Sequence, residues 1–352
     1  MTKISQKQAP YRVGTIGFGN MGSKWAAQFV ADSRWQLVSI CEQNADRRNE
    51  AAILAPNAHV TDDAEAVLAE PSIDAVGLFT LADHRPDQIR RALAVGKHII
   101  AEKPIAPDLE TEKTLLSEIE AHNQLVAVNL FNRNAWYHHE IQAFIEKGEI
   151  GKVGVLRVCH MTSGRLPGVS HEPEGPCFRD CGMHYVDVLR WYAGCEYAHW
   201  HSQGVRMWAE PEPWWVTVHG QFESGIAFEI TQGFVYGQTA KDWTCRCYFE
   251  AIGTQGIARY HHDFTNVNLE MHGTHETVRK IDSYGDKKLD VMTDLFARSL
   301  GAGCDLGLPN ARDSVIASRI AQQMHNDAVT AKPPCIGDED DLQFAIKNKT
   351  QK

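Results

Sequence analysis

The chain has 352 residues, of which 43% are hydrophobic and 23% are charged, and its formal net charge is -10. These values fit a globular protein of about two domains, and the negative charge argues against nucleic acid or an anionic membrane as a partner. The nine cysteines include no C-x-x-C pair, the first ten residues contain no apolar signal segment, and no run is long enough to span a bilayer. We therefore expect a cytoplasmic protein with reduced thiols.

A short β-type run that begins at Tyr11 leads into a glycine-rich loop and then into a helical stretch. The loop reads Gly17, Phe18, Gly19, Asn20, Met21 and Gly22. In a dinucleotide-binding loop the first glycine permits the tight turn, the second lets the backbone approach a pyrophosphate, and the third lets the helix pack closely. The helix N-terminus then offers N–H groups to the phosphates. The motif alone is weak, but its position between strand and helix favours a dinucleotide site.

The next strand-like run, residues 35–42, ends in Glu42, which lies twenty residues after Gly22. A carboxylate at this position would bind the ribose 2′-hydroxyl and would repel a 2′-phosphate, so it favours NAD over NADP. Arg47 and Arg48 lie just downstream and could soften that preference. The alternative is that Glu42 is only an exposed acid at a strand end.

Helical and strand-like segments then alternate, with helices expected over 46–54, 64–69, 86–95 and 110–122, and strands over 74–79, 97–101 and 125–130. The apolar run 74–79 is typical of a parallel strand that is covered on both faces. This order predicts an α/β domain with a doubly wound parallel sheet. Ligands bind beyond the carboxyl ends of such strands. The polar residues at those ends are Thr80, His84, Glu102, Lys103 and Asn129.

In the second half most predicted elements are strands. The β-like runs are 152–161, 198–207, 214–222, 225–236, 244–252, 256–261, 267–272 and 277–281. Helices are expected over 288–300 and 313–329. We predict an α+β domain with a large open mixed or antiparallel sheet. The expected division is 1–130 for the nucleotide-binding domain, 131–335 for a substrate-binding and oligomerisation domain, and 336–352 for a polar tail. One sheet face is expected to carry several aromatics and to pair with another subunit.

Within this half, residues 180–191 predict a helix that places Asp180, His184 and Asp187 on one face. Burying a carboxylate and an imidazole is costly unless both have partners. The line of polar groups is therefore either a satisfied Asp–His contact in the core or part of a catalytic site. The adjacent His138 and His139 are expected to point apart on a helix, and no carboxylate completes a metal set with the other histidines, so no metal is predicted.

Three motifs in this order carry a family resemblance: Gly17-x-Gly19-x-x-Gly22, Glu102-Lys103-Pro104, and Asp180-x-Gly182-x-His184-x-x-Asp187. Over residues 11–335 the chain resembles the glucose-fructose oxidoreductase, inositol dehydrogenase and MocA (Gfo/Idh/MocA) family of NAD(P)-dependent oxidoreductases. The resemblance implies a Rossmann domain, an open-sheet substrate domain and assembly into homodimers or homotetramers. It also implies hydride transfer between the nicotinamide and a secondary hydroxyl of a sugar, cyclitol or related polyol, in either direction.

Position by position, the resemblance makes Lys103 the active-site lysine and Asp180 and His184 the catalytic pair. Thr80 and His84 match a turn close to the cofactor, and Glu102 is expected beside it. His184 is the expected base because imidazole titrates near neutral pH. Asp180 would orient it or hold a substrate hydroxyl, Lys103 would stabilise negative charge on the reacting oxygen, and Asp187 is expected to be structural.

Two segments depart from the family pattern, Glu174-Gly175-Pro176 in place of a run of glycines and Leu130-Phe131-Asn132-Arg133 after a strand. In the family both segments border the substrate, so these departures leave the identity of the substrate undetermined. Two other functions also stay open: a relative that uses NAD transiently to cleave a glycosidic bond, and a ligand sensor that keeps the fold without turnover. Trp208, Trp214, Trp215 and Trp243 could stack on a sugar, although tryptophans are more often core or interface residues.

Overall fold

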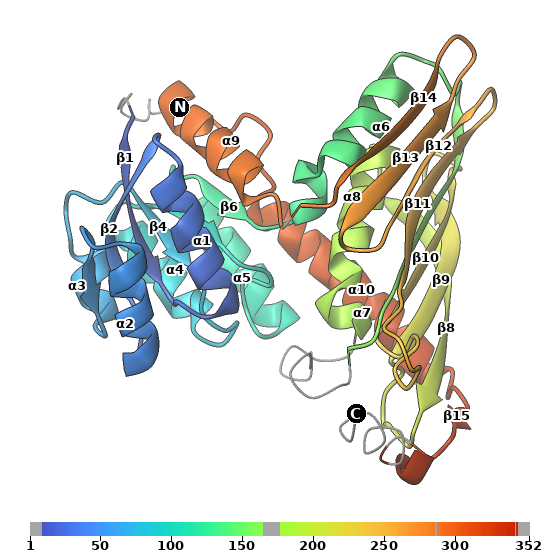
Figure 1. The fold of residues 1–352 in the computed structure, drawn as a ribbon, viewed down its shortest axis with the longest axis horizontal. Helices are drawn as coiled ribbons and strands as arrows, with labels where there is room; N and C mark the ends of the chain where they lie inside the picture. Colours follow the sequence, from blue (N-terminus) through green and yellow to red (C-terminus); the bar gives the residue numbers. More distant parts are fainter. Residues whose placement is uncertain (1–8, 165–176, 286, 342, 344–352) are drawn as a thin grey trace. The chain divides into compact units, whose positions relative to one another are not determined.

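The computed structural model describes residues 9–164, 177–285, 287–341 and 343. The chain divides into two compact units (Figure 1). The first unit is Met1–Asn134 together with Lys287–Ile316, and the second is Ala135–Asp286 together with Ala317–Lys352. Within the described ranges, no helix is long and apolar enough to cross a membrane.

The first unit is built on a six-stranded sheet in the order β3-β2-β1-β4-β5-β6, and every neighbouring pair is parallel. Its strands are β1 Tyr11–Ile16, β2 Trp35–Cys41, β3 His59–Thr61, β4 Ala75–Leu78, β5 His98–Ala101 and β6 Val126–Val128. The helices between them are α1 Asn20–Ala31, α2 Ala45–Leu54, α3 Ala64–Leu68, α4 Arg85–Ala94 and α5 Leu109–Glu120, and the 3₁₀ turn η1 Phe131–Asn134 follows β6. The strand order reverses between β1 and β4, so the predicted doubly wound parallel sheet is confirmed.

Helix α9, Leu289–Ala302, belongs to the first unit although it follows the strands of the second unit in the chain. Met292 and Phe296 of this helix share a buried cluster with Trp25 and Trp35, and the rings of Phe296 and Trp35 stack with centroids 5.8 Å apart. This helix therefore completes the hydrophobic core of the nucleotide-binding sheet.

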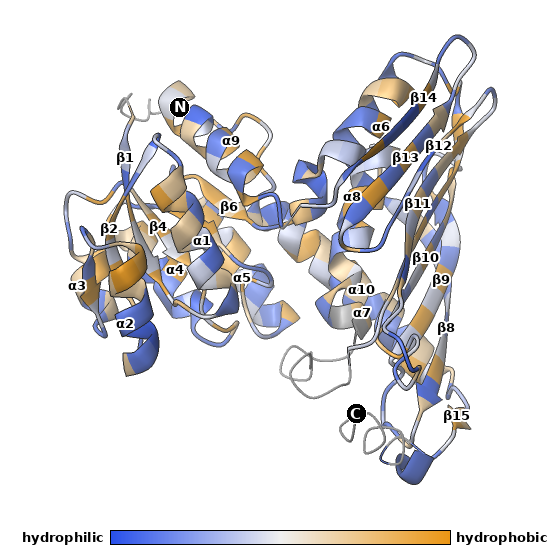
Figure 2. Ribbon diagram, in the orientation of Figure 1, coloured by the Kyte–Doolittle hydropathy of each residue, from blue (hydrophilic) through white to orange (hydrophobic). Residues whose placement is uncertain are grey.

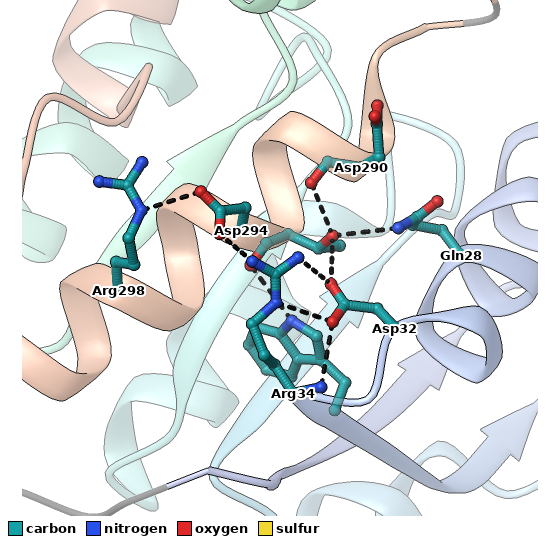
Figure 3. A network of polar contacts seen from close by, with 8 residues as sticks. Gln28, Asp32, Arg34, Asp290, Asp294 and Arg298 are labelled. Atoms are coloured by element: carbon teal, nitrogen blue, oxygen red, sulfur yellow. Dashed lines mark hydrogen bonds and ion pairs between the residues drawn. The ribbon is translucent and has the colours of Figure 1, made fainter.

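Polar contacts fasten the same helix to the loop before β2 (Figure 3). Asp32 accepts hydrogen bonds from Arg34, at 2.8 Å from Nε, and from the Thr293 hydroxyl, at 2.9 Å. Arg34 also pairs with Asp294 of α9, which accepts from Arg298 one turn later at 2.8 Å. The Thr293 hydroxyl also lies 3.1 Å from the Asp290 carbonyl of its own helix, so both this helix and the loop before β2 satisfy the buried side chain.

The second unit holds a nine-stranded sheet in the order β14-β13-β12-β11-β7-β10-β9-β8-β15. Its strands are β7 Val153–Met161, β8 Tyr197–Met207, β9 Trp215–Phe222, β10 Ala227–Gly233, β11 Arg246–Gly253, β12 Ile257–His262, β13 Asn266–His272, β14 Thr277–Ser283 and β15 Cys335–Ile336. The β7–β10 and β8–β15 pairs are parallel and the other pairs are antiparallel. The predicted open mixed sheet is therefore confirmed.

Four helices lie along one face of this sheet (Figure 1): α6 Trp136–Glu146, α7 Cys177–Asp180, α8 Gly182–Ala193 and α10 Ala311–Thr330. Helix α10 begins in the first unit and continues in the second from Ala317. The buried aromatics of the strands turn toward these helices, because Phe249 and Tyr260 both contact His138 of α6.

The other side of this sheet carries ion pairs beside its aromatic residues. There Arg157 of β7 forms ion pairs with Glu229 of β10 and Glu250 of β11, at 3.4 Å and 3.3 Å, and Arg259 pairs with Glu270 at 2.7 Å. Colouring by hydropathy shows blue and pale segments alternating along these strands (Figure 2). Period-two alternation sends most of the large rings to the helical side, whereas Tyr248 of β11 lies among the outward charges, with its ring centroid 5.4 Å from the guanidinium carbon of Arg246. Pairing of this face with another subunit stays a prediction.

The predicted single helix over 180–191 is interrupted. Helix α7 ends at Asp180, Cys181 is a turn residue, and α8 begins at Gly182. Packing explains the glycine, since a Cβ on Gly182 would lie 2.8 Å from the Phe178 ring. Asp180 and His184 therefore lie on either side of a turn rather than one turn apart on a continuous helix.

Candidate active site

The glycine-rich loop after β1 has three glycines with three different surroundings. Gly17 has φ +96°, and a Cβ there would lie 2.8 Å from the Phe79 carbonyl carbon. At Gly22 a Cβ would lie 2.1 Å from the carbonyl oxygen of Gly17. At Gly19 the nearest atom would be Arg47 Nη1, at 4.0 Å, so the space beside this residue is open. The first and third glycines shape the loop, and the second borders space for a ligand.

Helix α1 begins at Asn20, directly after the open position. No side chain of the described residues caps its N-terminus, and its first turn contains no acidic residue. Phe18 and Met21 face the core of the unit, and Asn20 is exposed. An open backbone at a positive helix end is the arrangement that a pyrophosphate requires. The residues present therefore fit the phosphates of a dinucleotide.

Glu42 lies immediately after β2 and is attached to the same loop. Its Oε2 accepts from the Phe18 N–H at 2.7 Å, and its Oε1 accepts from the Asn44 N–H at 2.9 Å. Arg47 reaches the loop as well, because its Nη1 donates to the Phe18 carbonyl at 3.1 Å. Arg48 instead contacts the Glu42 backbone carbonyl at 2.9 Å. A carboxylate and a guanidinium thus both border the loop, and ribose binding by Glu42 stays a prediction.

The turn after β4 holds Thr80 and His84. The Thr80 hydroxyl donates to Gln88 Oε1 at 2.7 Å, and His84 is exposed at the start of α4. Sequence reasoning missed Arg85, a buried residue whose guanidinium donates to the carbonyls of Thr80 and Pro104. It ties this turn to the Glu102-Lys103-Pro104 loop. The only local signal was an arginine at a helix start.

Glu102 and Lys103 directly follow β5, the next strand along the sheet. Glu102 is buried, and its Oε1 accepts from Trp25 Nε1 at 2.9 Å and from Asn129 Nδ2 at 2.8 Å. These bonds link α1, β5 and the end of β6, so Glu102 acts at least as a brace that fixes the loop. Lys103 follows it, half-buried, and the Lys103–Pro104 peptide is cis.

In the second unit, Asp180 and His184 are both buried, at 4% exposure each. The turn residue between the helices contacts both, because the Cys181 thiol donates to Asp180 Oδ2 at 3.4 Å and its carbonyl accepts from the His184 N–H at 3.0 Å. Asp187 is fully buried, and its charge adds to burial in raising the pKa of Tyr197 well above the usual range. The sequence thus places two buried ionisable side chains at one tight turn.

The remaining predictions concern the two segments that depart from the family pattern and the absence of a metal site. Glu174, Gly175 and Pro176 lie outside the described residues. Arg133 forms an ion pair with Asp313 at 3.0 Å inside the first unit. In the part of the chain that the structure describes, no three His, Cys, Asp or Glu side chains are grouped so as to hold a metal ion.

Known protein families and individual proteins resemble this chain in sequence. Residues 11–130 match the model of the oxidoreductase family with an NAD-binding Rossmann fold, and residues 138–259 match the GFO/IDH/MocA C-terminal domain. A 1,5-anhydro-D-fructose reductase of Ensifer adhaerens is 26% identical over 70% of this chain and 74% of its own. The scyllo-inositol 2-dehydrogenase (NAD(+)) of Bacillus subtilis (strain 168) is 26% identical over 70% of this chain and 72% of its own.

The solved structure of a putative myo-inositol dehydrogenase from Sinorhizobium meliloti 1021 has a similar fold. It superposes with a TM-score of 0.77 at 20% identity and covers 92% of this chain and 98% of its own. The two family models together span most of the sequence and both units. The resemblance inferred from the three motifs is confirmed: this chain belongs to the Gfo/Idh/MocA family of oxidoreductases, and its cofactor is NAD.

Proposed function

We propose that this enzyme transfers a hydride between NAD and a ring carbon that bears a secondary hydroxyl, in a sugar, sugar derivative or cyclitol. Family membership supports the redox chemistry. The names of the two relatives, a reductase of 1,5-anhydro-D-fructose and a dehydrogenase of scyllo-inositol, support a polyhydroxylated ring as the substrate.

The observation that carries the catalytic assignment is the turn at Cys181, which holds buried Asp180 and buried His184 together. In the direction of oxidation, His184 takes the proton from the substrate hydroxyl, which histidine can do near neutral pH. Asp180 orients the substrate by accepting from a neighbouring hydroxyl. Burial of both groups excludes competing water, which strengthens each of these contacts.

Lys103 of the first unit donates a hydrogen bond to the substrate oxygen that gives its proton to His184. This hydrogen bond stabilises the negative charge that develops on that oxygen. Bound NAD supplies the hydride acceptor, so that the C–H electron pair leaves with the hydride while the O–H proton goes to His184. A carbonyl is the product. The brace from Trp25 and Asn129 to Glu102 fixes the backbone from which Lys103 projects.

His184→Ala tests the assignment. We expect turnover to fall by roughly 10²–10⁴-fold, the usual contribution of a positioned acid–base group, while the affinity for NADH stays within twofold. The readout is NADH formation at 340 nm with a panel of inositols, sugars and 1,5-anhydro sugars. His275→Ala is the matched control, because its side chain is 83% exposed on a hairpin.

Unchanged turnover in His184→Ala would remove this histidine from the mechanism. Product formed by the native enzyme without accumulated NADH would instead favour redox-assisted bond cleavage over net oxidation. A protein that binds a ring substrate and NADH but turns over none of the panel would favour a sensor.

A further inference from the structure

Trp243 and Phe264 form an exposed aromatic pair in the second unit. Their side chains are 54% and 37% exposed, and their ring centroids lie 5.9 Å apart with the planes at 64°. Among the aromatic residues that the structure describes, these two are the most exposed. Trp243 belongs to the connection from β10 to β11, and Phe264 belongs to the turn from β12 to β13. Both segments meet at the sheet end where β7 and β10 finish.

Phe264 occupies its exposed position at a conformational cost. Its φ is +67°, in the left-handed region that glycine and asparagine favour and that bulky residues avoid. The turn is fixed by Asp263, whose Oδ1 accepts from the N–H groups of Thr265 at 2.9 Å and Asn266 at 2.8 Å. The ring also contacts those of His262 and Tyr284, with centroids 4.8 Å and 5.4 Å away, so only part of it is open to solvent. A bulky, partly exposed ring held in a strained turn indicates a function for the ring.

A line of ring contacts connects this pair to the candidate catalytic helix. The Phe264 ring lies 5.7 Å from the His160 ring, edge to face. The His160 ring in turn stacks on Tyr185 of α8, at 5.3 Å and 29°. Tyr185 directly follows His184 in the chain. The exposed pair is therefore the solvent end of an aromatic row that starts at Tyr185, the residue next to the proposed base in the chain.

We propose that Trp243 and Phe264 are the platform on which the ring of the substrate stacks, an inference that rests on the proposed function. A pyranose or cyclitol has a face of C–H groups and an edge of hydroxyls. The C–H face can cover an aromatic ring while the hydroxyls remain hydrogen-bonded. Two rings set at an angle support both the face and the side of one six-membered ring, which selects for rings over open-chain polyols.

The surroundings of the pair favour a small polar ligand over a protein partner. Lys241, Asp242 and Thr244, next to the tryptophan, are all exposed. An aromatic patch of two rings with charged neighbours is much smaller than the apolar patches that mark protein interfaces. Ring stacking with polar groups close by is instead typical of a ligand site of mixed character.

Two substitutions separate the role of the rings from that of the fold. We expect Trp243→Ala and Phe264→Asn each to raise KM for the ring substrate by about 5- to 10-fold, as the loss of one aromatic contact predicts, with kcat and NADH affinity within twofold. Asparagine tolerates the left-handed turn, so Phe264→Asn should keep the native Tm. Trp243→Phe should restore most of the lost affinity. Ile281→Ala, a 72% exposed residue of β14, is the control.

Substrate binding is also measured without turnover, by calorimetric titration of the substrate into NADH-bound His184→Ala with and without Trp243→Ala. Weaker binding in the double variant supports the platform. Unchanged KM and binding in both ring variants would overturn it, even if His184→Ala is inactive and the proposed function stands. If the ring variants weaken binding while His184→Ala turns over normally, the catalytic proposal fails and the platform stands. A smaller sedimentation coefficient with unchanged KM would identify a contact between subunits and overturn the platform.

Discussion

Among single residues, the glycines of the loop after β1 are required for different physical reasons. Gly22 has no room for a side chain because the Gly17 carbonyl lies where its Cβ would be. Gly19 has an ordinary backbone, with φ -71°, and open space beside it. The fold therefore does not itself require glycine at this position, and we propose that the close approach of the cofactor does.

Gly19→Ala and Gly22→Ala should fail in opposite ways. We expect the first to keep its Tm within about 1 °C while Kd for NADH rises at least about tenfold, because a methyl group fills the space of the pyrophosphate. We expect the second to lower Tm by several degrees, because its Cβ meets backbone. Thermal unfolding and NADH fluorescence measure the two effects. A destabilised Gly19→Ala with normal NADH affinity would contradict this reading.

The sequence identified the candidate site to the extent that its residues belong to local motifs. The twenty-residue spacing brought Glu42 to the glycine loop, where its carboxylate accepts from Phe18. Arg85 was not predicted, because its importance comes from two carbonyls in separate loops. Residue spacing encodes local geometry, whereas such cross-links depend on the tertiary fold.

At the level of helices and strands, His138 joins three elements in the second unit. This α6 residue is fully buried, with Nδ1 3.0 Å from the Tyr192 hydroxyl of α8 and Nε2 3.1 Å from the Tyr260 hydroxyl of β12. One donor and one acceptor suit a neutral imidazole. Burial, and to a smaller extent the neighbouring His139 and His262, lower the pKa of His138 to about 3.

This histidine should make the stability of the second unit depend on pH. Its folded pKa of about 3 lies below the unfolded value of about 6.5, so the unfolded chain binds the extra proton first. Its contribution is complete above pH 6.5 and is lost as the pH falls toward 3, at up to about 1.4 kcal/mol per pH unit. In urea unfolding at pH 7, 6 and 5, His138→Phe should be less stable at pH 7 but should lose less stability on acidification.

In His138→Phe the free energy of unfolding should still fall somewhat as the pH is lowered, because burial also lowers the pKa of His262 to about 4. Exactly parallel curves for the two proteins would show that His138 is not the group that titrates. The difference between the pH dependences of the two proteins, rather than its sign, is therefore what reports on His138.

The same scale shows where sequence patterns were sufficient and where they were not. Alternating and continuous apolar runs located the longer strands of both sheets, since burial on one or two faces leaves that signature. They missed β3 and β15, which are only three and two residues long. The break between α7 and α8 was missed, because the helical spacing of polar and apolar residues continues through Cys181, the turn residue at which the structure interrupts the helix.

On the scale of the whole molecule, the first unit is discontinuous in sequence. Residues Met292, Phe296 and Leu300 of α9 have the spacing of a buried helix face, so the sequence predicts that they are covered. The sequence does not show which domain covers these three side chains, because the sheets of both domains offer apolar surface. The stacking of Phe296 on Trp35 answers the question.

Phe296→Ala should therefore damage the nucleotide-binding unit, although the residue lies far along the chain. We expect a loss of about 3–5 kcal/mol, the usual cost of removing a buried phenyl ring. In calorimetry, the transition that shifts should be the one that NADH stabilises. Leu306→Ala, a 45% exposed position in the same unit, should leave that transition within about 1 °C. Loss confined to the NADH-insensitive transition would refute the assignment of α9.

The placement of α9 also has a consequence for biosynthesis. The core around Trp35 cannot close until residues 287–316 have left the ribosome, well after the six strands of its sheet are made. At a usual elongation rate the intervening segment takes on the order of ten seconds to synthesise. Throughout that interval the nascent nucleotide-binding sheet exposes the surface that Phe296 later covers. The time for which this apolar surface stays uncovered is therefore set by the rate of translation rather than by the sheet itself.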